Sequence, residues 1–209
     1  MSKTHDAKRT AQNAKGLIFV ISGPSGSGKT TLRDRLLEDK ILRKRLAKPI
    51  SFTTRPKRSK EQNGRDYYFI NRVQFEAKKR AKKILEWTRY LGYYYATPKD
   101  YVQHQLRRGR DVVLCTDLKG VANIKRLYPF NNVSIFVRPP SLGALEKRIT
   151  GRCHKTGKKE IKKRIGLAEK ELRKASSCDY QVLNKRLSYA LARLKGIVVK
   201  HTTQKNRRG

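Results

Sequence analysis

The stretch from residue 16 to residue 31, GLIFVISGPSGSGKTT, constrains the fold of this chain more than any other part. Residues 17–21 form a continuous apolar run, which is typical of a strand buried in a parallel sheet. A loop of glycine and serine follows, and after it Leu32 and Leu36 have the spacing of a helix. Strand, glycine-rich loop and helix in this order are the context that a phosphate-binding loop requires.

The loop matches that motif at each fixed position, Gly23-x4-Gly28-Lys29-Thr30. Glycines permit the positive φ angles that turn successive backbone N–H groups toward one anion, and the helix N-terminus adds its positive dipole end. We expect Lys29 to reach the β- and γ-phosphates of a nucleotide and the Thr30 hydroxyl to bind Mg²⁺. The predicted ATP-binding residues are Gly23, Pro24, Ser25, Gly26, Ser27, Gly28, Lys29, Thr30 and Thr31.

Length and composition exclude several other classes of protein. A chain of 209 residues favours one core with inserted lobes over two independent domains. No apolar run approaches the roughly 18 residues that span a bilayer, so we expect no membrane partner. Three widely spaced cysteines argue against a disulfide framework and for a reducing compartment, which we take to be the cytoplasm. We expect residues 1–15 to be a disordered basic tail. Their lack of large apolar residues argues against a mitochondrial presequence.

The charge is the most unusual property of the composition. Fifty-two Lys and Arg residues against 16 Asp and Glu residues give a net charge of +36. Such a surface predicts nonspecific contact with nucleic acid at low salt. The basic residues are spread along the whole chain, so the charge alone does not identify nucleic acid as the biological ligand. The sequence indicates no oligomeric state.

Strands and helices alternate on both sides of a segment of different character, and this predicts an α/β fold with a three-layer, parallel-sheet P-loop core. We expect the core to comprise residues 16–50, 99–150 and 166–200, with an inserted lobe at 51–98, a mobile lid at 151–165 and a disordered basic tail at 201–209. In the lobe, residues 67–70 and 84–90 predict strands and residues 75–83 a helix. We expect the first helix to continue towards Leu46, Ser141 to cap a helix, and the closing helix to span residues 189–194.

The inserted lobe carries a recognisable series of motifs: SFTTRPKR at 51–58, EQNGRDYYF at 61–69, LEW at 85–87 and GYYYAT at 92–97. In this order they resemble the nucleoside-monophosphate lobe of guanylate kinase. The resemblance extends from about residue 16 to about residue 184 and includes DLKG at 117–120, LEKR at 145–148 and CDYQVLN at 178–184.

This resemblance implies an enzyme that transfers the γ-phosphoryl group of ATP to GMP, with Mg²⁺ bound to the ATP. The implied GMP-binding residues are Ser51, Arg55, Arg58, Tyr67, Glu86, Tyr95, Thr97 and Asp117. Those implied to act on the transferring phosphoryl group are Lys29, Arg148, Arg152 and Arg164.

The residue types suit this chemistry. A carboxylate at Glu86 distinguishes guanine from adenine, because guanine N1 carries a hydrogen and adenine N1 carries a lone pair. Arg55 and Arg58 suit a dianionic phosphate. No general base is required, because the attacking phosphate oxygen belongs to a group with a second pKa of about 6. Viewed singly, Glu86 is also typical of a sheet surface and Arg148 of a solvated helix face.

The chain departs from the family pattern where Cys115 replaces the first acid of an Asp-x-Asp pair that ends at Asp117, and in a lid that is basic instead of acidic. These departures motivate one alternative, a catalytically weak guanylate-kinase-like interaction module. The charge of +36 motivates another, an RNA-associated basic protein.

Overall fold

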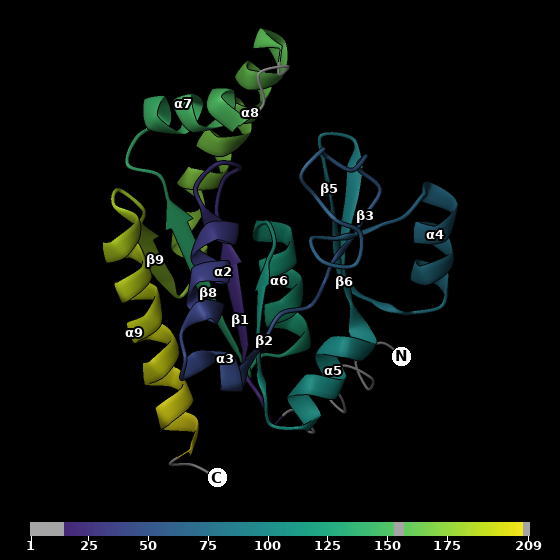
Figure 1. Cartoon of the computed structure of the whole chain (residues 1–209), viewed down its shortest axis with the longest axis vertical. Helices are drawn as coiled ribbons and strands as arrows, with labels where there is room; N and C mark the ends of the chain where they lie inside the picture. Colours follow the sequence, from purple (N-terminus) through teal and green to yellow (C-terminus); the bar gives the residue numbers. More distant parts are fainter. Residues whose placement is uncertain (1–14, 153–156, 207–209) are drawn as a thin grey trace. The chain divides into compact units, whose positions relative to one another are not determined.

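The computed structural model describes residues 15–152 and 157–206, and its central element is a parallel sheet of five strands in the order β2-β7-β1-β8-β9 (Figure 1). The strands are β1 (Ile18–Ser22), β2 (Leu46–Ala47), β7 (Asp111–Cys115), β8 (Asn132–Arg138) and β9 (Tyr180–Leu183). This confirms the α/β fold class expected from the sequence. The apolar run before the glycine loop is β1, whose five residues are all buried.

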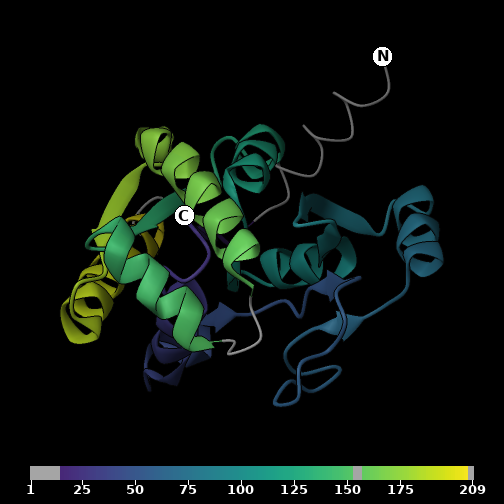
Figure 2. The ribbon, with the colours of Figure 1, turned by 90° about the horizontal axis from the view of Figure 1, so that it is seen from above.

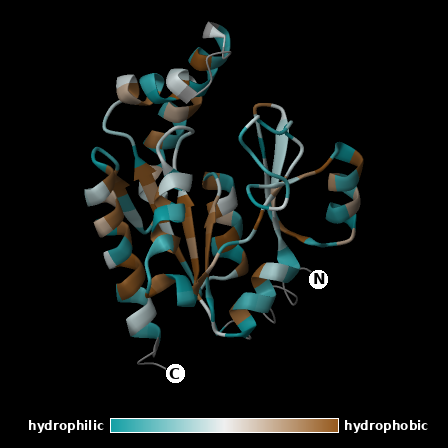
Figure 3. Ribbon diagram, in the orientation of Figure 1, coloured by the Kyte–Doolittle hydropathy of each residue, from teal (hydrophilic) through white to brown (hydrophobic). Residues whose placement is uncertain are grey.

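Hydrophobic residues concentrate in these strands, whereas the helices carry polar residues along one side (Figure 3). Phe19, Val20 and Ile21 of β1 have no exposed surface, and neither do Ile135 and Phe136 of β8. A strand that is covered on both faces needs apolar residues without alternation, which explains the continuous apolar runs in the sequence.

The chain forms two compact units. One comprises the described part of residues 1–18 together with 47–112 and 122–132, and the other comprises 19–46, 113–121 and the described part of 133–209.

In the second unit, the helix α2 (Lys29–Glu38) follows the glycine loop and packs against α9 (Leu187–Asn206). These two helices cover one face of the strands, and α8 (Lys158–Arg173) lies on the other face (Figures 1 and 2). The helix α7 (Leu142–Arg152) packs against α8 through Leu145, Ile149 and Ala168. The predicted cap of α7 is confirmed, because Ser141 Oγ accepts a hydrogen bond from Ala144 N at 3.1 Å.

The first unit contains a smaller sheet in the order β4-β3-β6-β5. Its strands are β3 (Phe52–Thr53), β4 (Tyr68–Phe69), β5 (Ile84–Tyr90) and β6 (Tyr93–Pro98). The helices are α4 (Arg72–Arg80) and α5 (Lys99–Arg107), and α6 (Leu118–Leu127) is shared between the two units. A capping box formed by Asn71 and Gln74 fixes the start of α4.

The two faces of the smaller sheet differ in chemistry. On one face, Phe75 of α4 packs against Trp87 and stacks on Tyr94, with ring centroids 5.9 Å and 4.5 Å away. On the other face, Glu86 and Thr97 lie opposite each other in the register of β5 and β6. Glu86 is 5% exposed and Thr97 is 2% exposed. Buried polar groups persist when they are hydrogen-bonded or serve a ligand, so this polar face is the candidate binding surface of the unit.

Three expectations from the sequence are wrong in detail. The first helix ends at Glu38, because the Asp39 carboxylate accepts hydrogen bonds from Ile41 N and Leu42 N and so begins a separate short helix, α3 (Leu42–Arg45). The smaller sheet has β3 and β6 in addition to the two strands expected, and β6 pairs with β5 across a turn at Leu91 and Gly92, both with positive φ.

The closing helix is also longer than expected. It passes through Gly196 to Asn206, although residues 201–209 were expected to be a disordered tail. Ile197, Val198 and Thr202 are buried at helical spacing, so tertiary packing outweighs the low helix propensity of glycine. The expected N-terminal tail and the middle of the expected lid lie outside the described residues, at 1–14 and 153–156. Within the described ranges, none of the helices has the length and apolar character needed to cross a membrane.

Candidate active site

The glycine loop between β1 and α2 has the backbone geometry that its sequence predicts. Gly23, Gly26 and Gly28 all have positive φ, at 134°, 88° and 96°. Gly28 is the N-cap residue of α2, so the loop leads directly into the N-terminus of that helix, toward which the backbone amides of its first turn point. Ser27 N donates to Pro24 O at 3.1 Å, which closes the loop on itself. Backbone amides arranged in this way form an anion-binding concavity.

Two neighbours pack so closely on the loop that side chains at the glycines would not fit. A Cβ on Gly23 would lie 2.4 Å from Val137 O, and one on Gly28 would lie 2.3 Å from Asn184 Nδ2. Asn184 is buried and donates from Nδ2 to Ser27 O at 2.8 Å. Its backbone N donates to Arg138 O at 2.8 Å. The residue that follows β9 therefore holds the middle of the phosphate loop.

Lys29 lies against the same loop, where its Nζ donates to Gly23 O and, at 2.9 Å, to Pro24 O. Its positive charge also acts on Glu171 of α8. Burial raises the pKa of the Glu171 carboxyl, against the lowering effect of Lys29 and together with the negative charge of Asp117. Asp117 Oδ1 accepts from Gly120 N at 2.9 Å and so caps α6. Two carboxylates and one ammonium thus share the electrostatic environment of the loop.

Two of the arginines implied by the resemblance lie on α7 and α8. Arg148 Nη2 donates to Asn184 O at 3.0 Å, so it contacts the same residue that holds the loop. Arg164 donates to Glu160 Oε1 from Nε at 2.9 Å and reaches Ser25 Oγ of the loop at 3.5 Å. Arg152 is the last residue of α7, and its side chain lies outside the described part of the chain.

In the smaller sheet, a carboxylate and a hydroxyl are buried next to each other. Thr97 Oγ1 donates to Glu86 Oε1 at 2.5 Å across the two strands. Glu86 thus presents a buried carboxylate on the polar face of this sheet, which suits a ligand that donates hydrogen bonds. A buried acid of this kind is selective, because a ligand without matching N–H groups leaves it unsatisfied.

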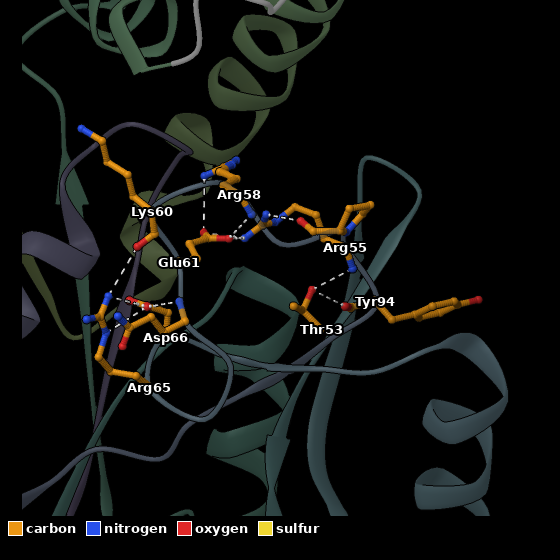
Figure 4. A network of polar contacts seen from close by, with 10 residues as sticks. Thr53, Arg55, Arg58, Lys60, Glu61, Arg65, Asp66 and Tyr94 are labelled. Atoms are coloured by element: carbon orange, nitrogen blue, oxygen red, sulfur yellow. Dashed lines mark hydrogen bonds and ion pairs between the residues drawn. The ribbon is translucent and has the colours of Figure 1, made fainter.

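Arg55 lies in the loop that follows β3, and the aromatic residues of the same unit surround it. Its guanidinium lies 5.6 Å from the ring centroid of Tyr67 and 5.9 Å from that of Phe69. The ring centroids of Tyr67 and Tyr95 are 6.0 Å apart, and, against the lowering effect of burial, the interaction with Tyr95 helps to raise the pKa of Arg55. Thr53 Oγ1 accepts from Arg55 N at 3.2 Å (Figure 4). Arginine and tyrosine hydroxyls in one place form a donor set suited to a phosphate.

The structure thus gathers the sequence-predicted residues into two groups. The first unit holds seven of the eight predicted GMP-binding residues: Ser51, Arg55, Arg58, Tyr67, Glu86, Tyr95 and Thr97. Glu86, Tyr95 and Thr97 share the polar face of the smaller sheet. Ser51 precedes β3 and pairs through its backbone, where its carbonyl accepts from Tyr68 N at 2.9 Å. Asp117 belongs to the second unit, with the loop and Lys29.

Sequence reasoning missed three polar residues that interact with these groups: Glu61 and Asn184 through hydrogen bonds, and Glu171 through its charge. Glu61 could have been noticed as an acid within a strongly basic segment, three residues after Arg58. Asn184 closes the last motif of the family resemblance, which marks the position but gives it no role. For Glu171 we find no signal beyond its place in an amphipathic helix.

Among the described residues, no group of three or more His, Cys, Asp or Glu side chains could hold a metal ion. Oxygen donors in the second unit include the Thr30 hydroxyl and two carboxylates: that of Glu171, on which Lys29 acts, and that of Asp117, which also acts on Glu171. This set fits Mg²⁺ that is carried by a nucleotide, because Mg²⁺ usually keeps waters and takes few protein ligands beside the phosphates.

Comparisons with known proteins agree with one another. The sequence model of the guanylate kinase family matches residues 15–208. A guanylate kinase of Bacillus cereus is 40% identical over 188 residues, which is 90% of each chain. One of Thermus thermophilus is 41% identical over 195 residues, 93% of this chain and 86% of that protein. The crystal structure of guanylate kinase from Anaplasma phagocytophilum superposes with a TM-score of 0.75 at 25% identity, covering 92% of this chain and 89% of that one.

Proposed function

The chain belongs to the guanylate kinase family and is a nucleoside monophosphate kinase, and we propose that it transfers the γ-phosphoryl group of ATP to GMP, giving ADP and GDP. The observation that carries the choice of acceptor is the buried Glu86 carboxylate, which is hydrogen-bonded to Thr97 on the polar face of the smaller sheet. Guanine offers N1–H and a 2-amino group to such an acid, whereas adenine offers a lone pair at N1. An apolar base-binding surface would not make this distinction as sharply.

The donor half of the reaction uses the glycine loop. Its amides and the N-terminus of α2 bind the phosphates of ATP, and Lys29 neutralises the charge that develops on the β- and γ-phosphates. The Thr30 hydroxyl would hold the Mg²⁺ that accompanies ATP, and this ion would supply further charge neutralisation. Arg164 already contacts Ser25 of this loop, which supports a role for it beside the transferring group.

The acceptor half positions the nucleophile. Arg55, Arg58, Tyr67 and Tyr95 bind the GMP phosphate, while Glu86, Thr97 and Ser51 bind the base. A phosphate oxygen attacks, and it is already ionised at neutral pH because its second pKa is about 6, so no side chain has to remove a proton. Catalysis then consists of in-line positioning and charge neutralisation, to which Arg148 and Arg152 contribute from α7.

The alternatives of an interaction module and an RNA-associated protein are not favoured by the comparisons. The phosphate loop keeps its glycines, its lysine and its packing against Asn184, and an interaction module has no use for them.

The test is a coupled assay of ADP release with ATP and Mg²⁺ and with GMP, AMP, UMP or no acceptor. We expect turnover with GMP alone. Glu86→Gln should lower the ratio of kcat/KM for GMP over AMP by about 100-fold or more, because a carboxamide also offers a donor to adenine N1. Glu76→Gln is the matched control, since it removes a charge from α4 of the same unit without touching the polar face. An unchanged ratio in Glu86→Gln would contradict the base-binding role, and no GMP turnover in folded protein would contradict the reaction.

A further inference from the structure

Glu61 lies in the segment between β3 and β4 and contacts both arginines that the proposed function assigns to the GMP phosphate (Figure 4). Arg55 Nη2 donates to both of its carboxylate oxygens, at 2.7 Å and 2.9 Å. Arg58 N donates to Glu61 Oε2 at 2.9 Å, and Arg58 Nη1 lies 3.9 Å from Oε1. One carboxylate therefore connects two cations that are three residues apart and would otherwise repel each other.

The contact with Arg55 is partly shielded from water. The side chains of Arg55 and Glu61 are 11% and 17% exposed, whereas the Arg58 side chain is 42% exposed. Burial alone would raise the pKa of Glu61, but hydrogen bonds from Arg55 and from the Arg58 amide outweigh it and lower the pKa. Glu61 is therefore ionised at neutral pH, and its bonds to Arg55 are charge-assisted.

The same carboxylate fixes the backbone. Glu61 N donates to Arg58 O at 3.1 Å while Arg58 N donates to Glu61 Oε2, so residues 58–61 form a turn closed from both ends. On the other side of Arg55, Nη1 donates to Pro56 O at 2.7 Å. The Nη2 group of Arg55 is thus directed at Glu61, and one Nη1 hydrogen is directed at Pro56. A ligand can therefore use only the remaining N–H groups of the guanidinium.

From these contacts we propose that Glu61 is a positioning residue for acceptor binding: it holds Arg55 and Arg58 in the arrangement that receives the phosphate of GMP. This inference rests on the proposed function. Arginine loses much rotamer freedom when it binds an anion, and a side chain ordered beforehand loses less. Glu61 also carries a negative charge that opposes the phosphate. The proposal is that ordering outweighs this repulsion, because the cluster keeps a net positive charge from two arginines and one acid.

The matched control is Asp66, which makes the same kind of contacts in the same segment but with a different arginine. Asp66 Oδ2 accepts from Gln62 N at 2.8 Å and from Arg65 Nη2 at 3.0 Å (Figure 4). Like Glu61, it closes a turn and pairs with an arginine. Arg65 is 58% exposed and has no assigned role in binding. A purely structural role for acids in this segment predicts the same outcome for Glu61→Gln and Asp66→Asn.

The experiment measures KM for GMP, KM for ATP and kcat in the wild type, Glu61→Gln and Asp66→Asn, with the Tm of each. We expect Glu61→Gln to raise KM for GMP about tenfold, because a charge-assisted hydrogen bond contributes about twice as much as a neutral one. KM for ATP should change less than about twofold in the same variant, and Asp66→Asn should leave both KM values near the wild type.

A binding measurement separates phosphate recognition from folding. Glu61→Gln should weaken the affinity for GMP and leave the affinity for guanosine, which has no phosphate, unchanged. The proposal is overturned if KM for GMP is unchanged or lower in Glu61→Gln, if both variants shift it equally, or if guanosine affinity falls as much as GMP affinity. Wild-type protein that does not use GMP would overturn the proposed function and this inference with it, whereas wild-type turnover with an unaffected Glu61→Gln variant would overturn this inference alone.

Discussion

The amide of Asn184 occupies the space that a side chain at position 28 would need, and Gly28→Ala tests how strongly the phosphate loop depends on this packing. The new Cβ would lie 2.3 Å from Asn184 Nδ2, far inside any normal contact. Asn184 would have to move, and its hydrogen bond to Ser27 O, 2.8 Å long and buried, would be lost. The substitution also places an alanine at a φ of 96°, which L-residues rarely adopt.

The expected loss of stability is the sum of two effects. An alanine in the left-handed region costs about 1–2 kcal/mol. A buried carbonyl that loses its partner costs about 1–3 kcal/mol. Gly28→Ala should therefore lower the free energy of unfolding by about 2–5 kcal/mol, which is large for a surface-loop glycine.

The two effects can be separated by urea unfolding of four variants. Gly92→Ala has a similar φ of 88° and nothing within 4 Å of the new Cβ, so it reports the backbone cost alone. Asn184→Ala removes the colliding amide. In the double variant Gly28→Ala/Asn184→Ala the collision is absent, so its loss should be smaller than the sum of the single losses by about 1–3 kcal/mol.

The reasoning is refuted if Gly28→Ala costs no more than Gly92→Ala, or if the two losses in the double variant simply add. In the enzyme assay, KM for ATP should rise in Gly28→Ala and in Asn184→Ala, because both disturb the carbonyl at the middle of the loop. Gly92→Ala should leave KM for ATP unchanged.

Three further substitutions test separate contacts. Asp39→Asn removes a carboxylate whose pKa is lowered to about 2 by hydrogen bonds from Lys195 and two backbone amides. The ionised carboxylate stabilises the folded state fully above about pH 4, and this contribution is lost as the pH falls toward about 2. The variant should therefore melt below the wild type at about pH 6 and together with it at about pH 2, and equal Tm values at both would contradict this. Cys115→Asp places a carboxylate at the end of β7 and should lower severalfold the Mg²⁺ concentration at half-maximal activity, as seen in a metal titration. Ser141→Ala removes the cap of α7 and should lower the free energy of unfolding in urea by about 1 kcal/mol; an unchanged free energy of unfolding would contradict the role of the cap.

The sequence predicts well those parts of the chain whose structure is decided locally. The strand before the glycine loop, the loop and the start of α2 follow from apolar runs, glycines and a helical repeat within 16 residues. The cap at Ser141 is also local, and it is confirmed.

Contacts between distant segments could not be predicted in this way. The end of α2 at Glu38 depends partly on Lys195, which pairs with Asp39 from 156 residues away in the chain. The continuation of α9 beyond Gly196 depends on the surface that buries Val198 and Thr202. The pairing of Glu61 with Arg55 depends on how the segment between β3 and β4 folds back on itself, and no periodicity in the sequence predicts that.

The hydrogen bond from Asn184 to Ser27 also has a consequence for the order of events during synthesis. The two residues are 157 positions apart, and Asn184 follows the last strand of the sheet. The glycine loop leaves the ribosome early, yet its carbonyl gains its partner only after nearly nine-tenths of the chain has been made. A contact between residues so far apart in the chain forms slowly, because the intervening chain loses conformational entropy before the contact stabilises it. A nascent chain that stops before β9 therefore carries the complete phosphate-binding motif without the contact that holds it, and nucleotide binding should begin only when that strand joins the sheet.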